Sequence, residues 1–349
     1  MISRRDFLKM GGTALASAML AGKLNISLVA ASENIQRGRV LYWNLPVHSE
    51  PNKSSHQVSN YKFNNLLPIM DKVLGGDEGD YNPWWFKIGH EGYAYSGGIQ
   101  LVKETMNPTR ADFPQGGLPG EVTVPYTESN WRTSGAFANI GSLMYYQTIH
   151  WIMGVVADPV SGRVWYRAYD HLYNKEYFLR PQHVRIIPEE EMTPISPHLD
   201  PAKKLIEVSL QEQKVRAYEG DRLVFISRAA TGKGVQKTPT GWFRTFHKRP
   251  SAHMVGGTDI ENYYDLPGVP WDTFITSEAV ALHGTYWHND FGTPHSYGCI
   301  NLPVPAARWI YRWTIPTVPY GTMYLLEPGK GVNVHVIEGP GGQGRRFNR

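Results

Sequence analysis

The chain has 349 residues, enough for two or three domains of ordinary size. Hydrophobic residues make up 41% of it and charged residues 19%, which is typical of a globular protein and excludes a disordered or fibrous chain. The formal net charge is +4, and residues 1–31 contribute +3 of it through four basic residues and one acidic residue. The remainder therefore lacks the basic surface that nucleic-acid binding requires.

The first 31 residues resemble a signal peptide of the twin-arginine type. Arg4 and Arg5 precede a weakly apolar run over residues 10–21, and small residues follow it. Glycines and a lysine interrupt the apolar region, which makes it a poor membrane span. The alternative is an amphipathic N-terminal helix. We expect export by the twin-arginine route and an extracytoplasmic mature protein, in the periplasm or cell wall, that begins near Ser32.

Short apolar or alternating runs, broken by Gly, Pro, Asn and Asp, follow from residue 37 and predict β-strands. A strand led by two aromatic residues occurs at Trp84 and again at Trp165, each time followed by a second aromatic strand. This order resembles bacterial SH3-like modules, which are small β-barrels. The resemblance implies one module over 37–105 and a second over 120–188, whose aromatic residues either bind cell-wall peptide or glycan or form the cores. A single irregular β domain is the alternative.

The second half of the chain predicts a further β domain. Residues 189–202 are acidic and then proline-rich, which indicates a linker. After the linker, alternating apolar residues predict strands at 205–210, 214–218, 222–227, 242–246, 280–283 and 322–326. Apolar residues at helical spacing predict one helix at 304–314. The Gly- and Arg-rich residues 329–349 predict a flexible basic tail.

The residues with chemical reactivity gather between His283 and Leu302. This segment contains Cys299, which is the single cysteine of the chain and excludes an internal disulfide framework, and three of the 13 histidines. Cys299 lies a few residues before the predicted helix, whose N-terminal partial positive charge would favour a thiolate. We therefore interpret Cys299 as a nucleophile; the alternative is a buried structural thiol.

The motif around this cysteine resembles the signature of L,D-transpeptidase catalytic domains. The chain carries Ser-Tyr-Gly-Cys-Ile-Asn over 296–301, with Cys299 sixteen residues after the His283 of a His-Gly pair. The segments 238–243 and 248–254 also resemble that family, and the likeness covers 203–328. Tyr297 departs from the pattern, because the family usually has His there. The resemblance implies a mainly β fold: a β-sandwich catalytic domain with a short helix after the cysteine.

The resemblance also implies roles for individual residues. Cys299 would attack a peptidoglycan stem tetrapeptide and release D-Ala, with His283 as general base and acid. The Gly284 carbonyl would orient the imidazole ring. The backbone N–H groups around Tyr297, Gly298 and Cys299 would form the oxyanion site, and Ser296 would shape the turn. His253 and Met254 would lie at the donor site. Asn301 would connect the turn to the helix and contribute to substrate binding.

An amine of a second stem would then resolve the thioester and form a 3→3 cross-link. The same acyl-enzyme could serve an L,D-carboxypeptidase or attach a protein to the wall. We expect no cofactor and no metal, and a monomer peripheral to the cell wall whose partners are stem peptides and not nucleic acid.

Three rival classes remain open. Zinc could be bound by His283, His288, His295 and Cys299, although the common ligand pairings are absent. A papain-like thiol peptidase would have its cysteine before its histidine, the reverse of the order here. A non-catalytic wall-binding protein would have lost the reactive pair, which this chain retains. Without such roles, His288 and His295 are expected to be exposed loop residues.

Overall fold

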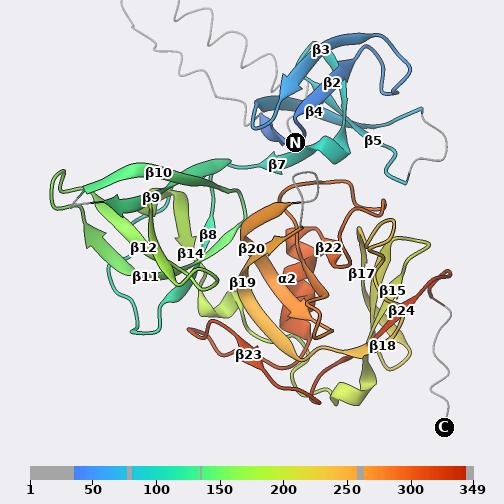
Figure 1. The fold of residues 1–349 in the computed structure, drawn as a ribbon. Coiled ribbons are helices and arrows are strands. Elements are labelled where there is room, and N and C mark those ends of the chain that lie inside the picture. Colours follow the sequence, from blue (N-terminus) through green and yellow to red (C-terminus); the bar gives the residue numbers. More distant parts are fainter. Residues whose placement is uncertain (1–34, 77–80, 134–135, 258–262, 343–349) are drawn as a thin grey trace, which may run out of the picture. The chain divides into compact units, whose positions relative to one another are not determined.

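A computed structural model describes residues 35–76, 81–133, 136–257 and 263–342, and the predicted signal peptide over 1–31 lies outside these ranges. Residues from Gln36 onward form one compact unit. That unit is mainly β, as predicted: four sheets and a single α-helix account for the regular structure of the described residues, apart from short 3-10 turns (Figure 1). No helix in the described ranges is long and apolar enough to cross a membrane.

The first sheet has the strand order β3-β2-β6-β5-β4-β1-β7. Its strands are β1 (Gln36–Val40), β2 (Asn44–His48), β3 (Gln57–Lys62), β4 (Leu66–Leu74), β5 (Trp84–Ile88), β6 (Gly92–Tyr95) and β7 (Ile99–Val102), with the 3-10 turn η1 (Ser96–Gly98) before β7. Alternating side chains of these strands enclose an apolar core that includes Val40, Leu45 and Phe86. Trp85, one of the predicted aromatic leaders, is buried.

The second sheet has the order β10-β9-β13-β12-β11-β8-β14. Its strands are β8 (Leu118–Val122), β9 (Tyr126–Thr133), β10 (Ala136–Tyr145), β11 (Ile149–Ala157), β12 (Val164–Asp170), β13 (Lys175–Leu179) and β14 (Val184–Ile186), with η2 (Pro181–His183) before β14. Ile152, Tyr166 and Leu179 lie in its core. The two sheets occupy almost the same ranges as the two predicted modules; the SH3-like kinship of the modules stays a prediction.

The predicted linker contains the 3-10 turns η3 (Glu189–Glu191) and η4 (Pro201–Lys203) and contacts the α-helix α2 (Val304–Trp313). Glu191 forms an ion pair with Arg308 of α2 at 2.7 Å. The Arg312 side chain donates a 2.8 Å hydrogen bond to the Thr193 carbonyl. This segment is therefore packed onto the following domain, and is not a loose spacer.

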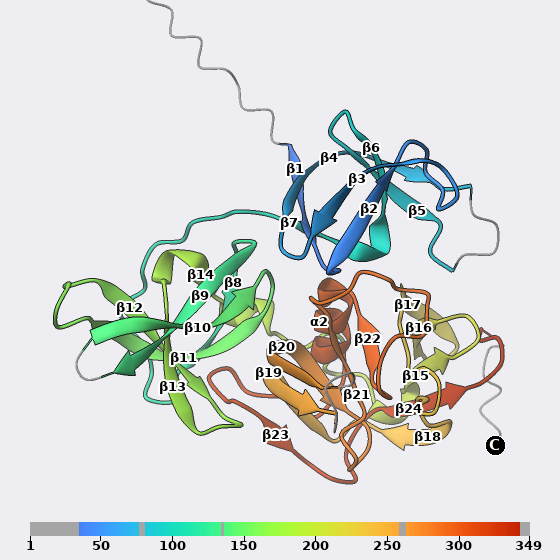
Figure 2. The ribbon, with the colours of Figure 1, turned by 45° about the horizontal axis from the view of Figure 1, so that its top comes forward.

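Two five-stranded sheets and α2 form the C-terminal part, in the orders β17-β16-β15-β24-β18 and β22-β21-β20-β19-β23. The first contains β15 (Lys204–Ser209), β16 (Lys214–Glu219), β17 (Arg222–Arg228), β18 (Gly241–Arg244) and β24 (Asn333–Ile337). The second contains β19 (His247–Gly256), β20 (Tyr264–Phe274), β21 (Ala281–Gly284), β22 (Ile300–Leu302) and β23 (Leu325–Leu326). The apolar face of α2 packs against β20 and β21 (Figure 2).

The prediction of a flexible tail over residues 329–349 is wrong for residues 329–342, the part of it that the structure describes. Strand β24 lies inside the first of these sheets, parallel to β15 and antiparallel to β18. Val334 and Val336 are buried, so the alternating apolar residues within this Gly-rich stretch decide its structure. The catalytic domain therefore extends past residue 328, and residues 343–349 lie outside the described ranges.

Candidate active site

Of the two predicted catalytic residues, His283 lies on a strand and Cys299 lies directly before the neighbouring parallel strand. His283 of β21 is the register partner of Asn301 of β22, and Cys299 lies directly before β22. Parallel pairing therefore brings together two residues that are sixteen positions apart in the sequence. Both His283 and Cys299 line a cavity of about 250 Å³, which Met254, Ser296, Tyr297 and Asn301 also line.

The thiol of Cys299 is held in its neutral form. Its Sγ contacts the Ala279 carbonyl oxygen at 3.6 Å, and burial raises the pKa of the thiol to about 11. This shift is opposite in direction to the thiolate that the predicted helix terminus would favour. Strand β22 and Pro303 separate Cys299 from the start of α2, and the helix field falls off within its first turn.

His283 is the matching neutral base. The ring is buried, which lowers the pKa of His283 to about 4. Its Nδ1 lies 3.0 Å from the Gly284 carbonyl oxygen, so Nδ1–H donates to that carbonyl and Nε2 is left as the nitrogen without a proton. Gly284 fits here because a Cβ would lie 2.8 Å from the Pro270 ring.

The turn before the nucleophile is held by two hydroxyl groups. Ser296 Oγ donates to the Cys299 carbonyl at 2.5 Å and accepts the Gly298 N–H at 3.2 Å. Gly298 has φ +116°, which strongly favours glycine. Thr238 Oγ1 donates to the Gly298 carbonyl at 2.8 Å and accepts the Gly232 N–H at 2.9 Å.

These contacts change two of the predicted roles. The Gly298 amide, one of three predicted oxyanion donors, already donates to Ser296, so it does not point an unused hydrogen at the cavity. Ser296 shapes the turn, as expected from the sequence. Thr238 was not predicted as a site residue, although it lies in the 238–243 segment that carried part of the family resemblance.

Tyr297, the departure from the family pattern, forms an aromatic wall of the cavity. Its ring stacks on the ring of Tyr264 with centroids 5.6 Å apart and planes at 22°. Both rings line the cavity that contains Cys299. Tyr297 thus presents an apolar, half-exposed ring at the position where the family usually has an imidazole.

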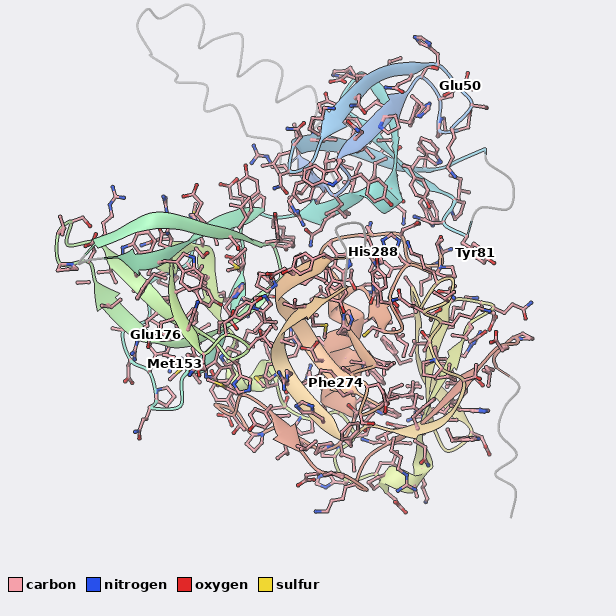
Figure 3. The ribbon with its side chains drawn as sticks, viewed as in Figure 1. Glu50, Tyr81, Met153, Glu176, Phe274 and His288 are labelled. Atoms are coloured by element: carbon pink, nitrogen blue, oxygen red, sulfur yellow. The ribbon has the colours of Figure 1, made fainter. Side chains whose placement is uncertain are left out.

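His288 is buried, which contradicts its expected place on an exposed loop (Figure 3). Its Nε2 lies 2.8 Å from the Asn301 side-chain amide nitrogen and its Nδ1 lies 3.3 Å from the Asp290 backbone nitrogen, and a neutral ring accepts a hydrogen bond through one of its two nitrogens. Its ring centroid lies 4.1 Å from that of His295, which lines the cavity and is partly buried. Burial lowers the pKa of His288 well below its usual range, so this ring is a neutral support for Asn301.

Asn301 is fixed at both its backbone and its side chain. Its N–H and carbonyl each form a 2.9 Å hydrogen bond with Ala230. Asn301 was predicted to connect the turn to the helix; it instead contacts Ala230 and His288. Asn301 still lines the cavity, as its predicted substrate-binding role requires.

His253 lies outside the catalytic cavity, so its predicted place at the donor site is wrong. Its two ring nitrogens lie 2.6 Å from Asp170 and 2.5 Å from Asp265, and it lines a separate cavity of about 320 Å³. Met254, the next residue of β19, lines the catalytic cavity. A bulge in β19 lies between Ala252 and Met254, and the two adjacent residues line different cavities.

The loop between His283 and Cys299 is held by the first sheet. Tyr95 Oη donates to Asp290 at 2.6 Å, and the Asn289 N–H donates to the Gly97 carbonyl at 2.9 Å. The Arg39 guanidinium donates to the Tyr286 carbonyl at 2.7 Å. No sequence signal links these partners, because they lie about 200 positions apart.

The histidines and cysteine of this region do not form a metal cluster. Among the described residues, no group of three or more His, Cys, Asp or Glu is arranged to hold an ion. The His288 nitrogens contact Asn301 and Asp290, and the His283 Nδ1 contacts Gly284. The zinc interpretation therefore has no ligand set in the described part of the chain.

The part of the chain that contains this cavity is similar in sequence to known proteins. Residues 203–334 match the YkuD family, described as the L,D-transpeptidase catalytic domain. A protein of Bacillus licheniformis named as an L,D-transpeptidase YkuD is 30% identical over 100 residues, which cover 28% of this chain and 52% of that protein. The chain thus spans about half the length of the curated relative it matches.

Solved L,D-transpeptidase structures are similar at lower identity. One from Mycobacterium smegmatis is 23% identical, with a TM-score of 0.32 and coverage of 39% of this chain and 59% of that one. The catalytic domain from Enterococcus faecium is 24% identical, with a TM-score of 0.30 and coverage of 38% and 96%. From the family match and the motif, residues 203–334 form an L,D-transpeptidase catalytic domain of the YkuD family.

Proposed function

We propose that this protein is a peptidoglycan L,D-transpeptidase that acts through a Cys299 thioester. The observation that carries the proposal is the placement of His283 on β21 and of Cys299 directly before its parallel partner β22, with both lining one cavity. A neutral imidazole whose Nδ1 faces a carbonyl has its Nε2 set to receive a proton. A partly exposed thiol on the same cavity is the group that can supply that proton and attack a carbonyl carbon.

The first half-reaction makes the acyl-enzyme. Because the pKa of Cys299 is about 11 and that of His283 about 4, the pair rests as thiol and neutral imidazole. Proton transfer to His283 Nε2 therefore accompanies attack of Sγ on the carbonyl between the third and fourth residues of a stem tetrapeptide. The S–C bond forms, the C–N bond breaks, and the proton passes from His283 to the amine of the leaving D-Ala.

The second half-reaction reverses this order with a different amine. A side-chain amine of another stem attacks the thioester carbonyl and gives a proton to His283 Nε2. The C–S bond breaks, and the proton returns to Sγ. The product is an amide, which is a 3→3 cross-link. We assign the developing oxyanion to the Cys299 amide, at the end of a turn fixed by Ser296 and Thr238.

The acceptor distinguishes this function from its nearest alternatives. Water as acceptor gives an L,D-carboxypeptidase, and an amine of a protein gives attachment of that protein to the wall. An alternative of another class is a cell-wall-binding protein without catalysis. The proposal includes twin-arginine export to an extracytoplasmic site, a monomer peripheral to the wall, and stem peptides as partners.

The test is intact-protein mass spectrometry of the purified full chain with a stem tetrapeptide, and in parallel with a carbapenem. We expect a tripeptide adduct with D-Ala release, and a carbapenem adduct, both located on Cys299. Cys299→Ala should form neither, and His283→Gln should acylate about 10²–10⁴-fold more slowly. Product sequencing with an added stem then identifies the acceptor. A folded wild-type chain that forms no adduct and releases no D-Ala overturns the proposal in favour of a binding protein.

A further inference from the structure

Five aromatic side chains form a continuous row that ends at the catalytic histidine. We call them the aromatic row: Trp43, Phe63, Tyr145, Tyr286 and Trp287. Successive ring centroids are 5.2, 6.1, 5.7 and 5.1 Å apart, and the last ring lies 5.7 Å from the His283 ring. The row begins in the first sheet region, passes through β10, and continues in the loop after β21. Trp43 at its outer end is 80% exposed.

A second cavity, of about 350 Å³, lies along this row. Phe63, Tyr145, Tyr286 and Trp287 line it. Leu266 and Trp287 line both this cavity and the catalytic cavity, so the two are neighbours that share a wall. Leu266 and Trp287 therefore form the boundary across which a molecule held at Cys299 would reach the second cavity.

The row is built as a rigid surface. The Arg39 guanidinium lies 4.2 Å from the Tyr145 ring centroid and donates four hydrogen bonds, to Gln100, Asn64 and the Tyr286 carbonyl. Tyr286 Oη donates to the Pro267 carbonyl at 3.0 Å. Fixed ring faces lose little conformational entropy when a ligand binds, which favours recognition of a flat partner.

The lining suits a sugar better than a charged peptide. Phe63 and Trp287 offer apolar surface to the C–H groups of a pyranose, whereas Tyr145 is stacked on Tyr286 and has Arg39 over its ring. Ser142 and the partly exposed Asp265 offer polar atoms for hydroxyl or amide groups. A stem peptide carries carboxylates, which would require a cation. Arg39, the cation that lines this cavity, already directs four hydrogen bonds to the protein.

The length of a donor stem agrees with this placement. Three residues separate the scissile carbonyl from the sugar that bears the stem, and three extended residues span roughly 10–11 Å. Two ring steps, of 5.7 Å and 5.1 Å, lead from His283 to Tyr286 in the wall of the second cavity. The sugar of a donor bound at Cys299 therefore falls within reach of the row.

We propose that the second cavity and the aromatic row bind the glycan of the substrate, with an N-acetylated amino sugar against Phe63 and Trp287. This inference rests on the proposed function. It implies that the protein acts on stems attached to glycan in preference to released peptides, and that residues of the first two sheets contribute to substrate recognition.

The test compares two donors with the full chain: the released stem tetrapeptide and the same tetrapeptide on its disaccharide. D-Ala release gives kcat/KM for each. We expect the disaccharide donor to be favoured about tenfold, which corresponds to about 1.4 kcal/mol. Trp43→Ala and Phe63→Ala should lower this ratio towards one and leave the rate with released tetrapeptide unchanged.

Trp242→Ala is the matched control. Trp242 is also a half-exposed ring, on β18, where it stacks on His335 and lines neither cavity. It should leave both rates unchanged. Equal use of both donors by the wild type, or a ratio that the row variants do not lower, overturns the inference.

Other outcomes identify another occupant and also overturn the inference. If the row variants slow only transfer to an amine acceptor, the second cavity holds the acceptor stem. If the row variants slow acylation by both donors equally, the second cavity holds the donor peptide. Failure of either donor to acylate the folded wild type contradicts the proposed function itself, whereas efficient acylation without a donor preference contradicts the glycan site alone.

Discussion

Thr238 donates a 2.8 Å hydrogen bond to the carbonyl of Gly298, the residue that precedes the nucleophile. The same hydroxyl accepts the Gly232 N–H, so one buried side chain connects two turns that lie 66 positions apart. Cys299 is therefore positioned by a contact outside its own motif.

Thr238→Val should loosen this turn while keeping the side-chain shape. Two buried backbone groups would lose their partner, which costs about 1–3 kcal/mol in free energy of unfolding. Displacement of the thiol should slow acylation on the order of 10- to 100-fold. Denaturant unfolding and the rate of carbapenem adduct formation measure the two effects. Thr238→Ser retains the hydroxyl and should stay close to wild type; equal activity of the valine variant would contradict the positioning role.

The neutral resting pair predicts an unusual pH dependence. The pKa of His283 is lowered to about 4, so the base is unprotonated above that pH, and acylation should fall only as the pH drops towards 4. The pKa of Cys299 is raised to about 11, so alkylation by iodoacetamide should keep increasing well above the ordinary thiol value of 9.0. Alkylation that reaches its plateau near neutral pH would show a thiolate and contradict this picture.

His288 should act through Asn301. Their side chains touch at 2.8 Å in a buried environment, so removal of either partner leaves the other unsatisfied. His288→Ala and Asn301→Ala should each destabilise the protein by about 1–3 kcal/mol and slow acylation. In a double-mutant cycle, the coupling energy should be about 0.5–3 kcal/mol. Strictly additive effects on both stability and acylation would show that the two residues act independently.

His253 should give a pH-dependent contribution to stability. Burial lowers its pKa, but the bonds to Asp170 and Asp265 outweigh burial, and the net pKa is raised. The contribution of His253 to folding stability is therefore fully present at pH values below 6.5, the pKa of this side chain in the unfolded chain. It is lost as the pH rises through the raised pKa of the folded state. Asp170 has a lowered pKa, despite burial, because of the same contact, so its share is lost only in acid.

His253→Gln should accordingly lower the free energy of unfolding by about 1–3 kcal/mol near pH 6 and by less near pH 9. Thermal unfolding at the two pH values measures this difference. His198→Gln, at an exposed position of the linker, is the control and should have little effect at either pH. A difference that grows with pH would mean that the neutral imidazole makes the important contact.

The sequence predicted best where the signal is local. The Ser-x-Gly-Cys motif and its spacing from His283 pointed to the family that residues 203–334 match. Alternating apolar residues predicted six of the ten strands of the catalytic domain, and the helical spacing after Cys299 predicted α2. Strands β19, β20 and β22 were not predicted. Strand β24 was missed because flanking glycines resembled a low-complexity tail, although Val334 and Val336 alternate as in any buried strand.

The side of a strand on which a residue lies was harder to predict. His253 and Met254 are adjacent in sequence, yet a strand sends them to different cavities, and a bulge in β19 between Ala252 and Met254 interrupts simple alternation. His288 was expected on the surface because its segment is polar. Its burial follows from contacts to Asn301 and to a loop that the first sheet holds.

By itself, the sequence determined which residues are candidates for catalysis and which family the catalytic domain resembles, because motif spacing and periodicity are properties of neighbouring residues. Only the tertiary structure decided the state of those residues. Burial raises the pKa of Cys299 and lowers that of His283, and it comes from segments far apart in the chain. The aromatic row likewise joins three parts of the chain, since ring contacts depend on packing and not on sequence distance.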